Sequence, residues 1–187
     1  MSSRILQINI KPNINNERGL PKRAIDDAYI SRLGIEGDHN NFRFTKKENN
    51  PDMAVLIITK DIIDDLNNEG WPIKPGDLGE NLTIIGLDYQ SIKPGQVLEV
   101  GSAKIKVSFI CDPCTNLKIL PYVGDDDDAQ LTGIIQGATG AASYEALVGE
   151  PGKAHQRMTS QSYVHILIIL LIMIGNISYF MLSRRKN

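Results

Sequence analysis

The feature that most constrains the fold is a series of short apolar segments separated by glycine and proline. Within Leu6–Ile10, apolar and polar side chains alternate, as expected for a strand that buries residues 6, 8 and 10 on one face. Further along, Val97–Val100 and the alternating segment Ile105–Phe109 flank Gly101 and Ser102, a pattern typical of a β-hairpin. A chain of many such segments buries its apolar side chains on sheets.

The same part of the sequence indicates one helix. Ala54–Ile58 is a continuous apolar run of strand length, and Thr59, which follows it, is a residue type that caps helices. Over Ile62–Leu66 the apolar side chains share one helical face, and Gly70 provides the end. With several strands and few helices, the fold class is mainly β, and we expect a barrel or a folded sheet.

The overall charge argues against one class of partner. The 187 residues carry a formal net charge of -2 at pH 7, whereas a nucleic-acid-binding domain normally has a basic stripe. Two cysteines cannot form a disulfide framework, and the alternating first strand does not resemble a signal peptide. We therefore expect no nucleic-acid partner, reduced thiols and a cytoplasmic location.

The last third of the chain differs in composition. Residues 125–160 contain the run Asp125–Asp128 and many glycines, which favours a solvated linker after a domain at residues 1–124, since the run lacks the ligand pattern of an EF-hand. Val164–Leu182 is almost entirely apolar and is followed by Arg184–Lys186. As a helix it would be roughly 28 Å long, close to the hydrocarbon thickness of a bilayer. We expect a membrane-spanning helix at 164–182, with a core helix or a non-native tail as alternatives.

Two short motifs carry the functional signal. Pro75–Thr83 is a glycine-containing loop that runs into a strand, and it either presents backbone N–H groups to an anion or is only a turn. The two cysteines, Cys111 and Cys114, are close together. A redox dithiol usually begins the helix of a βαβ unit, which the pattern does not show, and a zinc site needs two more ligands. We favour one working thiolate at Cys114, with two buried inert cysteines as an alternative.

Several motifs stand in the order seen in MOSC domains, the module named for the C-terminal part of molybdenum cofactor sulfurase. They are Gly19-Leu20-Pro21-Lys22, Gly34-Ile35-Glu36-Gly37-Asp38, Ala54-Val55-Leu56-Ile57, Glu69-Gly70-Trp71, the Pro75–Thr83 loop, Gly95 and Pro113-Cys114. The sequence resembles this family over Arg4–Gly124. The resemblance implies a MOSC-like β-barrel with few helices that binds the molybdenum cofactor (molybdopterin) or handles sulfur for it.

The resemblance also implies a catalytic and metal-binding role for Cys114. In family members that hold the cofactor, the resemblance implies that the cysteine after proline binds molybdenum as a thiolate. In sulfur-transfer proposals for the family, the same cysteine carries a persulfide. Both roles suit a polarizable thiolate, which binds soft metals and is the nucleophilic form of sulfur. Pyridoxal phosphate is linked to the family only through a domain that is fused to some members.

Five further residues are candidate cofactor ligands. Asn81 matches the asparagine of the family's Gly-Glu-Asn-Leu loop, and its amide both donates and accepts hydrogen bonds. Lys11, Lys22 and Arg43 are cations near the motifs that can meet a phosphate, with solvated surface charge as the alternative. His39 follows the second glycine motif, where some relatives have an arginine.

The end of the chain departs from the family pattern. After Gly124 we expect a closing strand, but the sequence shows the acidic linker and the apolar tail in its place. Three hypotheses for function follow. The chain is a molybdenum-dependent oxidoreductase that acts on a small-molecule substrate, a sulfur-carrier or cofactor-delivery module whose partner is a sulfur-donor protein, or an inactive truncated member.

Overall fold

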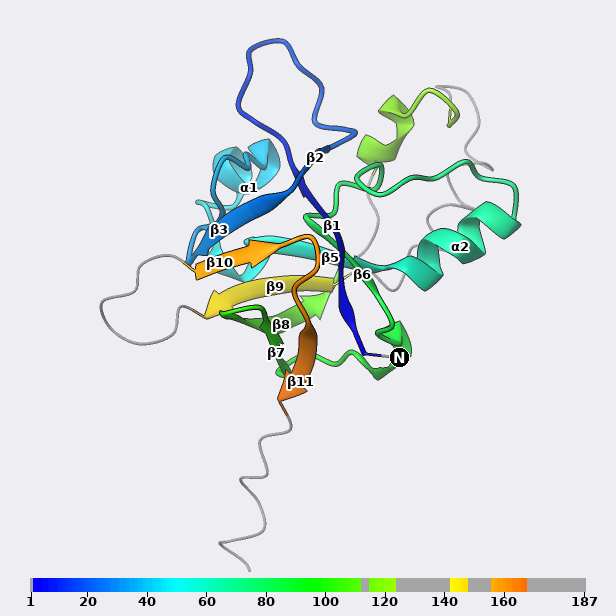
Figure 1. Ribbon diagram of the computed structural model, residues 1–187. Helices are drawn as coiled ribbons and strands as arrows, with labels where there is room; N and C mark the ends of the chain where they lie inside the picture. Colours follow the sequence, from blue (N-terminus) through cyan, green and yellow to red (C-terminus); the bar gives the residue numbers. More distant parts are fainter. Residues whose placement is uncertain (1, 112–114, 124–141, 148–155, 168–187) are drawn as a thin grey trace, which may run out of the picture.

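The computed structural model describes residues 2–111, 115–123, 142–147 and 156–167 (Figure 1). These residues form two sheets and a small number of helices. The larger sheet contains β1 (Arg4–Ile10), β2 (Arg23–Ile25), β5 (Val55–Thr59), β6 (Leu82–Ile85), β7 (Val97–Val100), β8 (Ala103–Ile110), β9 (Ala142–Leu147) and β11 (Val164–Leu167). The smaller sheet contains β3 (Asp27–Ser31), β4 (Gly34–Ile35) and β10 (Gln156–Thr159). The helices are α1 (Asn41–Lys46), α2 (Lys60–Asn68) and the short 3₁₀ helices η1 (Pro51–Met53), η2 (Tyr89–Ser91) and η3 (Thr115–Ile119).

The predicted fold class, mainly β with few helices, is confirmed for this part of the chain, but the barrel is not. The larger sheet runs β11-β7-β8-β9-β5-β6-β1-β2, and the smaller one β10-β3-β4. Strand β2 covers only Ile8–Ile10 of the outer edge of β1. The first half of that edge bonds to the chain just before β11, through a bridge between Arg4 and Tyr163 and an Ile5 N–H that donates to the Ser162 carbonyl at 2.8 Å. The sheet therefore curls until its ends touch, without closing as paired strands.

Three strands lie in the part of the chain that the sequence assigned to a linker and a membrane helix. Strand β9 pairs with β5 and β8, and β10 pairs with β3, so the linker predicted for 125–160 is wrong for these two segments. Strand β11 pairs with β7, so the helix predicted for 164–182 is wrong at its first four residues, while 168–182 lie outside the described residues. A short apolar run fits a strand as well as a helix, and an available strand edge decides between them.

The expectation that strands are missing after Gly124 is also wrong, because β9 occupies the middle of the larger sheet. Within the described ranges, no helix is long and apolar enough to cross a membrane.

The predicted hairpin is confirmed as β7 and β8, which pair antiparallel. Its last apolar residue, Phe109, is nevertheless 37% exposed, because the pairing with β9 shifts register between Val107 and Phe109. A similar shift between Ile5 and Gln7 interrupts the alternation in β1. Consequently the predicted burial is confirmed for Ile8 but is wrong for Leu6 and Ile10, which are only partly buried, while Ile5 and Asn9 are fully buried.

The predicted helix is α2, and it connects the parallel strands β5 and β6 as a βαβ unit. Ile62, Ile63 and Leu66 are buried, as their spacing indicates. Thr59 occupies the N-cap position, but its hydroxyl makes no capping hydrogen bond. Gly70 follows the helix with φ of +101°, a conformation that favours glycine.

Two apolar cores hold these elements. The first lies inside the curled sheet and includes Ile5, Ile8, Ile57, Leu82, Leu98, Ile105 and Met158. The second lies between β5, α2 and η3 and includes Ile58, Ile62, Leu66, Ile73, Leu78, Leu117 and Leu120. Figure 1 shows α1 beside β3 and α2 on the other side of β1, so the two helices occupy separate regions of the molecule.

Candidate functional site

Asp38 joins three segments that are distant in the sequence. It follows the turn at Gly37, which has φ of +81°. Its Oδ1 accepts a hydrogen bond from the backbone N–H of Lys11 at 2.8 Å, and its Oδ2 accepts one from Lys22 Nζ at 3.0 Å. The side chains of Lys22 and Asp38 are each 7% exposed. This buried carboxylate therefore holds together the loops around it through charge-assisted hydrogen bonds.

Lys22 is used for this structural contact. Burial lowers its pKa, and the neighbouring Asp38 carboxylate opposes that shift. The ammonium points at Asp38 and is withdrawn from solvent. The structure thus places this predicted cofactor residue next to the site, with its charge already paired.

Lys11 is also paired. Its Nζ donates to Glu17 Oε2 and to the Pro12 carbonyl, both at 2.8 Å. Glu17 also bonds to Arg23, and the hydrogen bond from Lys11 is the main cause that lowers the pKa of Glu17. The Lys11 carbonyl accepts the backbone N–H of His39 at 2.7 Å. Lys11 therefore supports the segment that carries His39.

Arg43 differs from the two lysines. It lies on α1, where its backbone N–H donates to the side chain of Asn40 at the helix N-cap. Its Nη2 donates to the Leu33 carbonyl at 2.6 Å. The residue is only 7% exposed, yet its Nε and Nη1 have no hydrogen-bond partner among the described residues. Burial lowers the pKa of Arg43, although a guanidinium remains charged in proteins.

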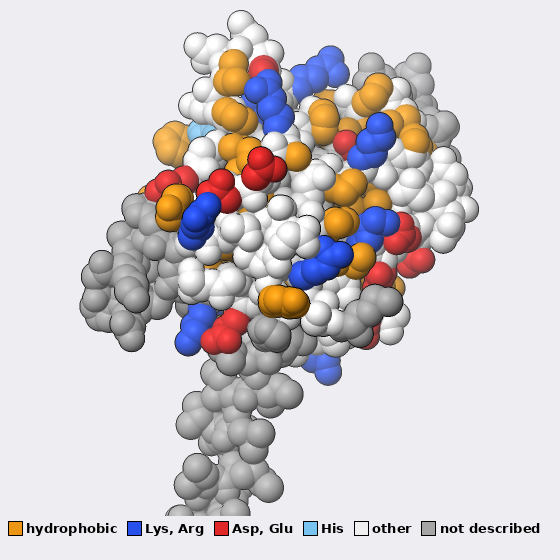
Figure 2. Space-filling view, viewed as in Figure 1, with side chains coloured by type: hydrophobic (Ala, Val, Ile, Leu, Met, Phe, Trp, Pro, Cys, Tyr) orange, Lys and Arg blue, Asp and Glu red, His pale blue; other side chains and the backbone are white. Residues whose placement is uncertain are grey.

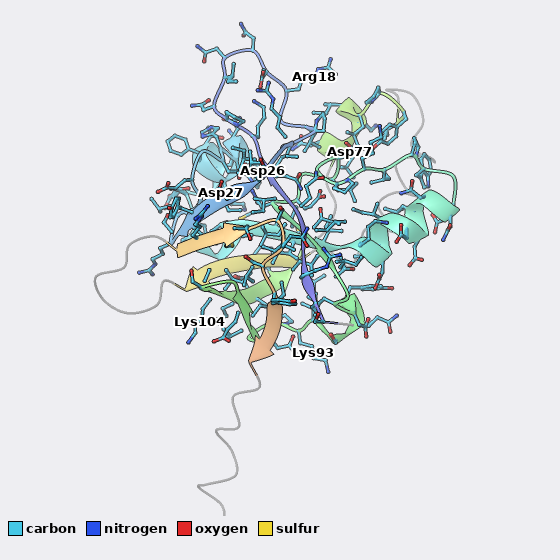
Figure 3. All side chains as sticks on the ribbon, viewed as in Figure 1. Arg18, Asp26, Asp27, Asp77, Lys93 and Lys104 are labelled. Carbon is cyan, nitrogen blue, oxygen red and sulfur yellow. The ribbon has the colours of Figure 1, made fainter. Side chains whose placement is uncertain are left out.

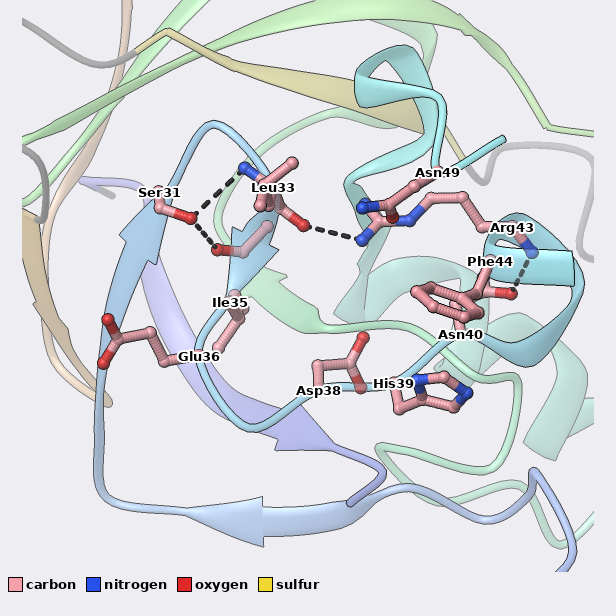
Figure 4. Close-up of a pocket in the computed structure, with 11 residues that line it drawn as sticks. Ser31, Leu33, Ile35, Glu36, Asp38, His39, Asn40, Arg43, Phe44 and Asn49 are labelled. Carbon is pink, nitrogen blue, oxygen red and sulfur yellow. Dashed lines mark hydrogen bonds between the residues drawn. The ribbon is translucent and has the colours of Figure 1, made fainter. Parts of the chain in front are cut away.

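A pocket of about 310 Å³ opens between α1 and the turn that joins β3 to β4. Figure 4 shows Arg43 reaching from α1 toward Leu33, with Asp38 and His39 below it. Leu33 and Phe44 also line the pocket and are each 60% exposed. The rings of His39 and Phe44 lie 5.3 Å apart. The structure thus brings two of the predicted residues, Arg43 and His39, into one pocket. Lys11 and Lys22 do not line the pocket but hold Asp38, which does, through hydrogen bonds.

Asn81 does not face this pocket. It is 2% exposed, its Nδ2 donates to the Asn9 carbonyl at 3.2 Å, and its Oδ1 accepts the Leu56 N–H at 3.1 Å. The amide links the backbones of β1 and β5 from its position before β6. The side chain is therefore a brace between strands, and its predicted contact with a cofactor remains a prediction.

Sequence reasoning did not single out Glu80, which precedes Asn81. Glu80 is fully buried, and its Oε1 accepts the Gly76 N–H at 2.6 Å and the Thr83 hydroxyl at 2.8 Å. Its Oε2 has no hydrogen-bond partner in the part of the chain that the structure describes, and burial raises the pKa of the carboxyl. A carboxylate between a glycine and an apolar strand was the available signal. Only glycine fits at position 76, since a Cβ there would lie 2.6 Å from the Lys22 carbonyl oxygen.

The loop before Glu80 is fastened to the segment that follows the cysteines. The Tyr122 hydroxyl donates to Asp77 Oδ2 at 2.8 Å. Burial raises the pKa of Tyr122, and the hydrogen bond to Asp77 raises it further. Leu78 packs in the second core with Leu117 and Leu120. In Figure 3, Asp77 lies on the other side of β1 from Asp27. The Pro75–Thr83 loop therefore contacts residues 115–123, which follow the cysteines.

Cys114, the predicted catalytic and metal-binding residue, lies outside the described residues. Cys111 is half-buried and packs against the second core. The βαβ unit that the sequence did not reveal begins its helix at Lys60, far from the cysteines in the chain, so it lends no support to a redox dithiol. The described ranges contain no group of three His, Cys, Asp or Glu side chains that could hold a metal ion.

The chain matches the MOSC domain family over residues 45–153, more than half of its length, and it belongs to this family. YiiM from Geobacillus stearothermophilus has a similar structure, with 19% identity and a TM-score of 0.62 over 99% of this chain and 86% of that one. YuaD from Bacillus subtilis has 14% identity and a TM-score of 0.65 over 88% and 94%. A crystal structure of a hypothetical protein has 21% identity and a TM-score of 0.60, and the match covers 89% of this chain but 66% of that protein. No curated protein matched.

The resemblance drawn from the motifs is thereby confirmed. The MOSC family is associated with binding of the molybdenum cofactor and with sulfurase-like function. The match is to the MOSC domain and gives no support for pyridoxal phosphate or for a membrane span.

Proposed function

We propose that this protein binds the molybdenum cofactor and uses it as a small-molecule oxidoreductase, with the pocket beside Arg43 as part of the binding site. One observation carries the proposal beyond family membership. The buried guanidinium of Arg43, with two nitrogens that have no partner among the described residues, lines the pocket. Asp38, which pairs with Lys22, lines the same pocket. Buried polar groups are normally hydrogen-bonded, so these donors favour an acceptor-rich ligand.

The residues present fit the chemistry of the cofactor. Molybdopterin carries a phosphate and a pterin edge with several acceptors, and Arg43 supplies donors for such groups. His39 lines the same pocket and adds a ring that donates or accepts. Lys11 and Lys22 contribute indirectly, because their charges are paired with Glu17 and Asp38.

Cys114 completes the proposal through the family resemblance, as the thiolate that would bind the metal. When bound, a molybdenum centre supplies exchange of an oxo group with an oxidised substrate. The chain's own contribution is to hold the anionic end of the cofactor at Arg43 and to present one soft ligand at Cys114. Since β9, β10 and β11 follow Gly124, a missing closing strand no longer supports the alternative of an inactive, truncated member.

The test is the content of the purified protein. Molybdenum is measured by mass spectrometry and pterin by fluorescence after oxidation, in the wild type and in Cys114→Ala and Cys111→Ala variants. We expect both to co-purify with the wild type and with Cys111→Ala and to be lost in Cys114→Ala. Equal losses in both variants would contradict the single thiolate. Labile sulfane sulfur without molybdenum would favour the sulfur-carrier hypothesis, and absence of all three would refute the proposal.

A further inference from the structure

We infer that the pocket between α1 and the β3–β4 turn binds a phosphate-type oxyanion attached to an apolar or aromatic body, with Arg43 as the anion-binding residue. The inference deepens the proposed function, because the cofactor's phosphate is one source of such a group. Its test below does not depend on loaded cofactor.

The local balance of charge singles out Arg43. Lys11 and Arg23 both bond to Glu17, and Lys22 bonds to Asp38. Within the described part of the chain, the Arg43 guanidinium forms no ion pair with a carboxylate, and the charge of Asp38 only partly offsets the effect of burial on its pKa. An unpaired charge in a buried position is costly, and an anionic ligand removes that cost.

The geometry leaves two donors of the guanidinium without partners among the described residues, and both nitrogens are buried. The bond from Nη2 to the Leu33 carbonyl holds the guanidinium in place, so its orientation is set before a ligand arrives. Nη1 and Nε remain without acceptors. Gly34 gives the guanidinium room, since a Cβ there would lie 3.5 Å from Nη1 and 2.6 Å from the Ala54 carbonyl. A tetrahedral oxyanion offers more acceptors than a carboxylate or a halide and suits a guanidinium.

The two carboxylates that line the pocket do not cancel this attraction. Asp38 is already neutralised by Lys22 and by the Lys11 N–H. Glu36 is exposed, so water and salt screen its charge. On the face seen in Figure 2, acidic and basic side chains are interspersed, so long-range attraction contributes little and the pocket itself must select the anion.

The rim defines the rest of the ligand. Leu33 and Phe44 are more than half exposed although both line the pocket. Large apolar side chains left open beside a polar site are typical of a surface that a ligand covers. An apolar or aromatic group attached to the oxyanion would pack on Phe44 and Leu33 while Arg43 holds the charge.

The experiment compares inorganic phosphate with phenyl phosphate as probes of the purified protein at constant ionic strength. Binding is followed by the Nε–H resonance of Arg43 and by calorimetry. We expect phenyl phosphate to bind about tenfold more tightly than phosphate, from burial of part of its ring. Arg43→Gln should weaken both probes roughly ten- to a hundredfold, and Arg43→Lys should weaken them less. Arg32→Gln, which removes an exposed charge outside the pocket lining, should change neither.

Phe44→Ala tests the apolar part without altering the charge. It should abolish the preference for phenyl phosphate while phosphate binding is retained. The inference is overturned if the wild type binds neither probe, if Arg43→Gln binds as the wild type does, or if the two probes bind equally. Circular dichroism checks that each variant folds, and the Phe44 and Arg43→Lys variants keep the test decisive should Arg43→Gln unfold.

The outcomes separate the two proposals. Phosphate binding in a protein that never contains pterin would leave the anion site standing and refute the cofactor proposal. Retention of molybdenum and pterin in a folded Arg43→Gln variant that no longer binds phosphate would show that the oxyanion is a free ligand or part of the substrate. Loss of pterin together with phosphate binding would identify the cofactor's phosphate as the source.

Discussion

Replacing Asn81 by leucine should destabilise the protein, because this side chain braces two strands. The change removes the donor to the Asn9 carbonyl and the acceptor of the Leu56 N–H, so one backbone group loses its partner in a buried place and the other in a partly buried one. Each unpartnered buried group costs about 1 to 3 kcal/mol, so we expect a loss of about 2 to 6 kcal/mol. This is a large part of the total stability of an ordinary domain, about 5 to 15 kcal/mol.

The assay is urea denaturation followed by circular dichroism, with Asn13→Leu as the matched control because Asn13 is exposed. With a slope of about 1 to 3 kcal/mol per molar urea, the Asn81 variant should lose roughly 1 M or more from its midpoint, and the control should change little. If Asn81→Leu unfolds at the midpoint of the control yet no longer retains cofactor, the brace interpretation is refuted and a direct ligand contact is favoured.

Three further predictions test the neighbouring contacts. Glu80→Gln should flatten the dependence of stability on pH, since burial raises the pKa of Glu80. The stability that the protonated Glu80 carboxyl contributes is fully present below about pH 4.3, the unfolded-state pKa, and is lost as the pH rises through the folded-state pKa. Urea midpoints from about pH 4 to pH 8 check this, and equal slopes in both proteins would contradict it. Tyr122→Phe should cost about 0.5 to 1.5 kcal/mol and speed hydrogen exchange in residues 115–123, with the exposed Tyr29→Phe as control. Asp38→Asn should cost about 3 to 5 kcal/mol by leaving the Lys22 charge buried and unpaired, and a Lys22→Met change in the same protein should restore part of that loss in a urea titration.

Some structure follows from short stretches of sequence alone. The turn at Gly101 and Ser102 between two apolar segments predicted the β7–β8 hairpin, and the spacing within Ile62–Leu66 predicted the buried face of α2. Both depend on residues close together in the chain, for which periodicity and turn chemistry are reliable guides. The order of the motifs along the chain, which is read from the sequence without any tertiary contact, was enough to indicate the MOSC family.

Other features could not be predicted because they depend on distant partners. The apolar run at Val164 begins as strand β11, since β7 offers it an edge to pair with. The register shifts in β1 and β8, which changed the buried residues, also arise from pairing with other strands.

For the candidate site, the sequence by itself determined which residue types are present, and only the tertiary structure decided what each can do. Lys11, Lys22 and Arg43 are equivalent in the sequence as cations near glycine motifs. In the folded chain Glu17 and Asp38 pair with the two lysines, whereas Arg43 keeps two buried nitrogens without partners. The physical reason is that a side chain's availability to a ligand depends on its burial and its counter-charge, and both are set by contacts between segments far apart in the chain.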